Sequence, residues 1–149
     1  MEYVIKKFDA LTAEELFEIY KLRVSVFVVE QNCAYQEVDD CDRAAVHVML
    51  RDADGIAAYL RVLPSGSAFD DVSIGRVTAV RRREGLGTKI VSKGIEVAEK
   101  EFGAGTIVIE AQTYAKSLYE KLGFVQTSDE FLEDGIPHVR MERKRHIQI

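Results

Sequence analysis

The chain has 149 residues, a formal net charge of −5 at pH 7 and a sequence pI of about 5.3. Hydrophobic residues make up 47% and charged residues 30%, which is ordinary for a globular protein with its own core. The acidic balance argues against nucleic acid as the main partner, because proteins that bind it usually carry a basic face. No apolar run approaches the roughly 20 residues of a membrane span. We therefore expect one domain, residues 1–149, in the cytoplasm, with neither a nucleic-acid nor a membrane partner.

In chain order, residues 3–8 predict a strand, and the capping box of Thr12 and Glu15 then predicts the start of a helix. The apolar residues that recur at helical spacing in this helix are Leu16, Tyr20, Val24 and Phe27. Residues 30–42 follow and read as irregular. The turn residues Asp54-Gly55 separate two apolar runs, so they predict a hairpin of two antiparallel strands.

The second half of the chain predicts strands that alternate with helices. After a strand at residues 72–80, a turn leads into an amphipathic helix that Gly103 is well placed to end. Residues 106–111 form an apolar strand, residues 115–123 a short helix, and two further strands close the chain. The strand–helix–strand unit should be a right-handed crossover with parallel strands. The whole pattern predicts a mixed α/β sheet with helices packed against it.

The turn "VRRREGLGTKI", residues 80–90, stands out in this acidic chain because three arginines precede Gly85 and Gly87. The first amides of a helix have no internal partner, and the helix dipole adds positive potential there. A glycine-rich helix start is therefore suited to an anion, most often a phosphate. A Walker A loop is excluded because Lys89 follows Thr88, and the dinucleotide fingerprint lacks its third glycine. A plain solvated connection is the alternative to a phosphate site.

The pattern Arg82-x-x-Gly85-x-Gly87, between a strand and an amphipathic helix, resembles the acetyl-CoA signature of the GNAT family of N-acetyltransferases. Downstream, "LYEKLGF" is similar to the helix end Tyr-x-x-x-Gly-Phe of that family. The segments "LRVSVFVVEQNCAYQEVD", "IGRV", "AQTYAKSLYEKLGF" and "EDGIPHVRM" together resemble the ElaA-like members over nearly the whole chain. Arg83 departs from the family, which usually has a small residue there. The resemblance implies the GNAT fold: an α/β fold with a mixed, mostly antiparallel sheet, a central parallel strand pair that splays, and helices on both faces.

The resemblance also implies acetyl-CoA as the cosubstrate. Cys33 and Cys41 are eight residues apart with no nearby set of Cys or His, so we expect no metal. Backbone amides from Arg83 to Thr88 would hold the pyrophosphate of acetyl-CoA, while residues 77–79 would pair with the pantetheine arm. The full set of expected acetyl-CoA contacts is Val77, Thr78, Ala79, Arg82, Arg83, Glu84, Gly85, Leu86, Gly87 and Thr88. An amine would attack the thioester directly, so neither Cys33 nor Cys41 is needed as a nucleophile.

Direct transfer to an amine raises two proton problems. A lysine-like amine with a pKa of about 10.4 is neutral in only about one molecule in 2,500 at pH 7, so a base would help, and the leaving thiolate needs a proton donor. Tyr119 matches the helix tyrosine of the family and is the expected donor. For the base we expect His138, with Glu110, Glu133 and a water relay as alternatives. His47 lies inside a strand pattern and is expected to be structural.

The acidic segment "EVDDCD", residues 37–42, is open to two interpretations: a solvated loop, or a rim that attracts a cationic amine. The resemblance places the acceptor site beside the first helix and the loop after it, so Glu30, Glu37 and Asp39 are the expected acceptor contacts. Three arginines in apolar patterns need acidic partners if they are buried, and Glu30 and Asp39 are natural choices. These arginines are Arg23, Arg61 and Arg76.

We therefore expect an acetyl-CoA-dependent N-acetyltransferase that acts on a primary amine of a small molecule or peptide, as a monomer or a homodimer. One alternative is a non-catalytic acyl-CoA-binding or sensor module on the same fold. Another is a protein for a different phosphate ligand, such as a nucleotide. Tyr119 and His138 favour catalysis, since a mere binder needs neither. The sequence does not identify the amine.

Overall fold

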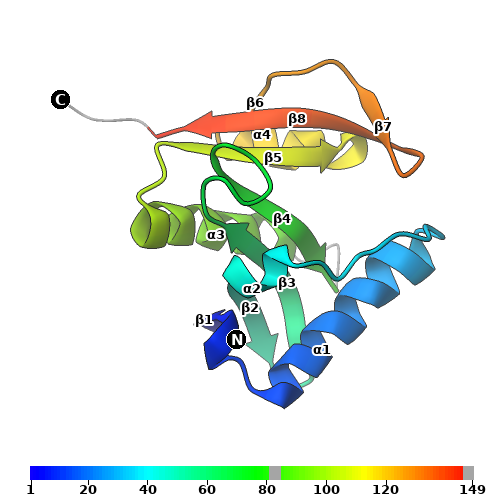
Figure 1. Ribbon diagram of the computed structural model, residues 1–149, viewed down its shortest axis with the longest axis vertical. Helices are drawn as coiled ribbons and strands as arrows, with labels where there is room; N and C mark the ends of the chain where they lie inside the picture. Colours follow the sequence, from blue (N-terminus) through cyan, green and yellow to red (C-terminus); the bar gives the residue numbers. More distant parts are fainter. Residues whose placement is uncertain (81–84, 146–149) are drawn as a thin grey trace.

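The computed structural model describes residues 1–80 and 85–145 (Figure 1). The strands in these ranges are β1 (Glu2–Lys7), β2 (Val46–Asp52), β3 (Gly55–Leu63), β4 (Val72–Ala79), β5 (Thr106–Gln112), β6 (Val125–Gln126), β7 (Phe131–Glu133) and β8 (Ile136–Lys144). The helices are α1 (Ala13–Val24), α2 (Cys41–Ala44), α3 (Leu86–Phe102) and α4 (Lys116–Lys121), with the 3-10 turns η1 (Phe8–Ala10) and η3 (Thr113–Ala115) and a π-helical turn, η2 (Ser25–Glu30), that continues α1. None of the described helices is both long and apolar enough to cross a membrane.

The strands form one sheet in the order β1-β2-β3-β4-β5-β8-β6, and β7 pairs with β8 beside this path. The β4–β5 pair is parallel, and the other neighbours in this order are antiparallel. Helix α3 connects β4 to β5, as the crossover predicted from the sequence requires (Figure 1). The mixed sheet with a central parallel pair is therefore confirmed.

Local signals in the sequence placed the ends of several elements correctly. The amide of Glu15 donates to the Thr12 hydroxyl over 3.1 Å and the amide of Thr12 donates to the Glu15 carboxylate over 2.9 Å, so the predicted capping box begins α1. Gly103 caps the end of α3 with a φ of +59°. The β2–β3 hairpin pairs from Asp52 and Gly55 around the predicted turn.

Helices cover both faces of the sheet, as expected. In β3, Ala58 and Leu60 pack into the core cluster beneath α3, whereas Tyr59 between them packs with Ile19 of α1 on the opposite face. A Cβ added to Gly94 of α3 would lie 2.7 Å from a methyl carbon of Leu60, so glycine lets this helix approach the sheet closely. Figure 1 shows α1 and α3 separated by the strands.

The buried face of α1 differs from the predicted one. Its fully buried residues are Ile19 and Arg23, whereas the apolar residues expected to face the core are only partly buried. A charged residue can occupy this position because two carboxylates, Glu37 and Asp42, contact the Arg23 guanidinium at 2.7 Å. Hydrophobic spacing alone could not predict that this helix buries an arginine, which it pairs with carboxylates of the loop after η2 and of α2.

Strands β4 and β5 run together for only a short distance. They pair at Val72 with Ile107 and at Ser73 with Val108, but β4 continues to Ala79 and β5 to Gln112. Beyond Ser73 the register of β4 against β3 shifts, so that residues 76 and 77 stand opposite a single residue of β3. Such a bulge bends its strand. The predicted separation of the two parallel strands is present, and it determines where the pocket lies.

Candidate active site

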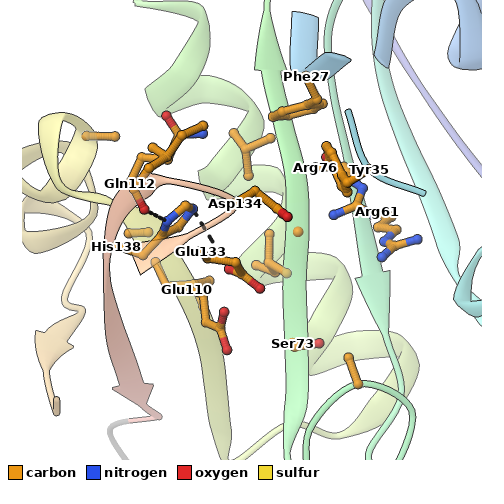
Figure 2. A pocket seen from close by; sticks show the side chains of 18 of the residues that line it. Phe27, Tyr35, Arg61, Ser73, Arg76, Glu110, Gln112, Glu133, Asp134 and His138 are labelled. Atoms are coloured by element: carbon orange, nitrogen blue, oxygen red, sulfur yellow. Dashed lines mark hydrogen bonds and ion pairs between the residues drawn. The ribbon is translucent and has the colours of Figure 1, made fainter. Parts of the chain in front are cut away.

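A pocket with a volume of about 510 Å³ lies where β4 and β5 separate (Figure 2). Its walls are residues 73–77 of β4 and 109–112 of β5, the hairpin formed by β7 and β8, and the loop that follows η2. These elements are far apart in the sequence, and the splayed strand pair brings them to one cavity. The cavity is therefore built by the sheet itself.

Polar side chains gather on one face of the β5–β8 pair. Ile109 and Ala111 of β5 pack into the α3 core, so the alternating residues Glu110 and Gln112 lie on the opposite face. Gln112 is the cross-strand partner of His138. Glu110, Gln112 and His138 all line the pocket, so one side of it is a polar layer above the apolar core (Figure 2).

His138 is held so that one ring nitrogen is available to a ligand. Its Nδ1 lies 2.7 Å from the carbonyl oxygen of Ile136, which can only accept, so Nδ1 carries the proton and donates. The Nε2 atom of the neutral ring is then an acceptor, 3.9 Å from a carboxylate oxygen of Glu133. The ring also stacks on Phe131, with centroids 6.0 Å apart. The geometry suits an imidazole that accepts a proton in the cavity.

Glu110 lies next to His138 in the same polar layer. Burial, together with the neighbouring Glu133 carboxylate, raises the pKa of Glu110 to about 7, against the opposing charge of Arg140. A carboxyl group with this pKa exchanges its proton near neutral pH. Within the described residues, no set of His, Cys, Asp and Glu side chains is grouped to hold a metal ion.

Tyr119 of α4 reaches the pocket from the other side of the sheet. The residue is buried and packs edge-on against Phe124, with ring centroids 5.8 Å apart. Burial, with a smaller effect of Tyr114, raises the pKa of the Tyr119 hydroxyl well above its usual range. The group therefore keeps its proton and can act only as a donor or a neutral acceptor.

A network of ion pairs, largely buried, lies at the edge of the pocket; its members are Arg23, Arg61, Arg76, Glu37, Asp39 and Asp42. Arg23 contacts Glu37 and Asp42, while Arg61 contacts Asp42 at 3.0 Å and Asp39 at 2.7 Å. The prediction that Asp39 pairs with a buried arginine is confirmed. Glu37 and Asp42 were not recognised as the partners of Arg23, because sequence cannot say which carboxylates of an acidic run turn inward.

The predicted contact between Glu37 and the amine acceptor is wrong. Glu37 is 2% exposed and its carboxylate already contacts two guanidinium groups, so it is a structural residue. The interpretation of residues 37–42 as a solvated loop fails at this position for the same reason. Asp39 does line the pocket, whereas Glu30 is exposed at the end of η2 and is not part of the pocket wall.

Arg76 connects this network to the bulge of β4. It has a φ of +55°, a left-handed conformation that costs a residue other than glycine roughly 1–2 kcal/mol. Its guanidinium donates to the carbonyl oxygen of Glu37 over 2.8 Å and lies 5.6 Å from the centre of the Tyr35 ring. Arg76 and Tyr35 both line the cavity, so this strained residue fixes the loop after η2 against β4 (Figure 2).

The expected acetyl-CoA contacts divide into residues that the structure describes and residues that lie outside the described ranges. Val77 lines the pocket, and Gly85 has a φ of +68° at the start of α3, where no described side chain caps the first amides. A Cβ on Gly87 would lie 2.9 Å from a methyl carbon of Leu118, so this glycine also serves the packing of α3 against α4. Three of the expected contacts, Arg82, Arg83 and Glu84, lie outside the described residues.

Residues 10–145 match the family model of the acetyltransferase (GNAT) domain. The chain belongs to the GNAT acetyltransferase family. A UPF0039 protein of Schizosaccharomyces pombe is 46% identical to this GNAT protein over 145 residues, which cover 95% of each chain. Protein ElaA of Escherichia coli is 34% identical over 138 residues, which cover 90% of each chain.

Solved structures agree with this assignment. The crystal structure of E. coli ElaA superimposes with a TM-score of 0.89 at 31% identity, covering 97% of this chain and 100% of that chain. An acyl-CoA N-acyltransferase from Pseudomonas aeruginosa gives a TM-score of 0.89 at 35% identity, covering 96% of this chain and 99% of that chain. The resemblance to ElaA-like acetyltransferases is confirmed, and the GNAT protein is an enzyme of the N-acyltransferase class.

Proposed function

We propose that this GNAT enzyme transfers the acetyl group of acetyl-CoA to a primary amine of a small molecule or peptide. The observation that supports this most strongly is the cavity between the splayed strands, which is faced by both a proton acceptor, Nε2 of His138, and a protonated donor, Tyr119. Direct transfer to an amine needs both kinds of group. A protein that only binds or senses acyl-CoA needs neither.

The proposed binding site of acetyl-CoA consists of backbone groups of β4 and α3 that have no partner among the described residues. Past Ser73, β4 has no partner among the described strands on its β5 side, so residues 77–79 are free to pair with the amides of pantetheine. The uncapped first amides of α3, from Gly85 to Thr88, suit its pyrophosphate. Leu86 is buried, so only its backbone can serve. Acetyl-CoA would supply an activated thioester for attack by a neutral amine.

In the proposed mechanism the protein moves two protons. His138 takes the proton of the bound ammonium at Nε2 while its Nδ1 stays hydrogen-bonded to Ile136. As the amine attacks the thioester carbon and the carbon–sulfur bond breaks, Tyr119 passes its proton to the departing CoA sulfur and regains one from the nitrogen that becomes the amide. Asp39 lies at the pocket wall and is proposed to attract the cationic acceptor, and Glu30 to steer it from the exposed end of η2.

We further propose that residues 1–149 act as one catalytic domain in the cytoplasm, as a monomer or a homodimer. The match to the GNAT domain over residues 10–145 supports the first point. Cys33 and Cys41 are unpaired, which agrees with a reducing compartment.

Two measurements test the proposed function. A thermal-shift comparison should show stabilisation by acetyl-CoA and CoA and none by ATP, since only the former match the splayed strands. Release of CoA thiol should then be detected with members of a panel of primary amines and amino-terminal peptides. Stabilisation by acetyl-CoA without CoA release from any amine would instead support the sensor module, and stabilisation by ATP alone would support a nucleotide site.

The Tyr119→Phe variant should lower kcat by roughly 10²–10⁴-fold, the usual contribution of a general acid. The ring should keep its packing against Phe124, so the melting temperature and the affinity for acetyl-CoA should change little. The matched control is Tyr3→Phe, which removes a hydroxyl that does not line the cavity and that donates to the backbone carbonyl oxygen of Lys89. Unchanged turnover in Tyr119→Phe would exclude the donor role.

A further inference from the structure

We propose that the acceptor amine also carries an amide carbonyl group, as in an amino acid amide or a peptide, and that Nε of Arg61 binds the oxygen of this carbonyl beside Gly75. The inference rests on the proposed function of the pocket and specifies its substrate class. It follows from a buried donor without a partner, from a glycine that leaves space next to this donor, and from the charges of the pocket wall.

Arg61 of β3 has one nitrogen that the ion-pair network does not use. Its Nη1 donates to Asp39 over 2.7 Å and to Asp42 over 3.0 Å, and its Nη2 donates to Asp39 over 3.2 Å. The Nε atom is buried and makes no hydrogen bond to any described residue, although Arg61, which is 5% exposed, lines the pocket. Buried donors nearly always have a partner in folded proteins. The unpartnered Nε therefore indicates an acceptor atom that a ligand supplies.

Gly75 of β4 lies directly opposite Arg61 and lines the same pocket. Cross-strand partners share one face of a sheet, so a side chain on Gly75 would lie on the same face as that of Arg61. Among the described residues other than its chain neighbours, a Cβ added to Gly75 would meet a single atom within 4 Å, Nε of Arg61 at 4.0 Å. Glycine thus leaves open the space that borders the unpartnered donor.

Neither the backbone nor the packing requires a glycine at position 75. The left-handed residue at the β4 bulge is Arg76, whereas Gly75 is not among the residues with a positive φ. An added Cβ would meet no atom closer than 4.0 Å, in contrast to Gly94, where it would collide with Leu60. A glycine inside a strand weakens it and often marks a place where a ligand approaches the backbone closely. A ligand oxygen in this space accounts for both the glycine and the unpartnered Nε.

The charges around Nε favour a neutral oxygen over a carboxylate. The guanidinium of Arg61 already faces two carboxylates, and Arg76, the other arginine of the pocket wall, contacts the Glu37 carboxylate at 3.1 Å. No arginine or lysine among the described lining residues is left to neutralise a further anion, and Figure 2 shows Glu110 and Glu133 across the cavity from Arg61. An amide carbonyl oxygen is a neutral acceptor. It accompanies a primary amine in amino acid amides and peptides.

The first test compares CoA release from primary amines that differ in this carbonyl. Glycinamide and β-alaninamide are each compared with the alkylamine of the same length and with the corresponding free amino acid. We expect the better amide to exceed its alkylamine by roughly 10- to 100-fold in kcat/KM, the range for a hydrogen bond to a charged group. The amide should also exceed the free amino acid, because the pocket offers no unpaired arginine or lysine among its described residues.

The second test places a methyl group beside Nε. Gly75→Ala should reduce the ratio of kcat/KM for the amide to that for the alkylamine by about tenfold or more, and differences in amine basicity cancel because both enzymes receive the same amines. The melting temperature should not fall, since alanine restricts the unfolded chain more than glycine does. The matched control is Gly105→Ala, at an exposed position outside the pocket where an added Cβ meets nothing within 4 Å. It should leave the ratio unchanged.

Equal kcat/KM values for amides and alkylamines, or a ratio that Gly75→Ala leaves intact, would overturn the inference while CoA release from alkylamines upheld the proposed function. A preference for free amino acids over amides would assign a carboxylate to Nε and overturn the proposed substrate class. Absence of CoA release with every amine, despite binding of acetyl-CoA, would overturn both proposals. Should Gly75→Ala unfold, Gly75→Ser provides a further test, because its hydroxyl can accept from Nε in place of the ligand. A folded Gly75→Ser enzyme with an undiminished ratio would also count against the inference.

Discussion

Replacing Arg23 with methionine should lower the free energy of unfolding by about 3–5 kcal/mol, the usual loss when one partner of a buried ion pair is removed. Methionine fills a similar volume but leaves Glu37 and Asp42, which are 2% and 1% exposed, without their shortest contacts. Arg76 and Arg61 remain near these carboxylates at 3.1 and 3.0 Å, so the loss should stay within this range.

Urea unfolding measured at neutral pH checks this value. The matched control is Arg43→Met, because Arg43 pairs with Asp40 over 3.2 Å at the surface, where such pairs contribute less than about 1 kcal/mol. Similar small losses in both variants would show that the network is not required for stability. The loop after η2 should also lose its order in Arg23→Met, which hydrogen exchange of residues 33–39 would detect.

Acid unfolding should also depend on the ion pairs that Arg23 and Arg61 make with Asp42. Burial alone would raise the pKa of Asp42, but the hydrogen bond and charge of Arg23, with the charge of Arg61, outweigh burial and hold this pKa below its usual range. A carboxyl group with a lowered pKa stabilises the fold above its unfolded value, about 3.9, and this contribution is lost as pH falls through the folded pKa. Without Arg23 the pKa of Asp42 should rise, so acid unfolding should begin at a higher pH.

Local sequence signals predicted the order of the main elements, and long-range contacts explain what they missed. The capping box of Thr12, the hairpin at Gly55 and the end of α3 at Gly103 each depend on neighbouring residues, and all three are confirmed. Helix α2 and strand β7 are only four and three residues long. Such short elements exist because tertiary contacts hold them, so hydrophobic spacing could not predict them.

At the candidate site, too, the sequence identified individual residues, whereas long-range contacts determine how they are arranged. His138 and Tyr119 were identified from the sequence by residue type and resemblance, and the fold brings both to the cavity. The hydrogen bond that orients His138 and the meeting of Glu110 with Glu133 depend on the β7–β8 hairpin. Gln112 was overlooked, although its spacing of two from Glu110 in a predicted strand indicates the same face.

The His138→Ala variant should lose roughly 10²–10⁴-fold in kcat, as expected for removal of a general base. The affinity for acetyl-CoA, measured by thermal shift, should be retained, because the proposed pantetheine and pyrophosphate contacts lie on β4 and α3. Loss of turnover with retained affinity would separate a role in proton transfer from a role in folding.

Glu110 is the alternative base, so a second variant must distinguish it from His138. Glu110 titrates near pH 7, faces Glu133 and Arg140, and lies beside His138 in the polar layer of the pocket. If His138 is the base, turnover is lost in His138→Ala and largely retained in Glu110→Gln. The opposite pattern would make Glu110 the base and would exclude His138. Because Nδ1 is held by Ile136, only Nε2 is free to accept the proton of the amine, and the first pattern is the one we expect.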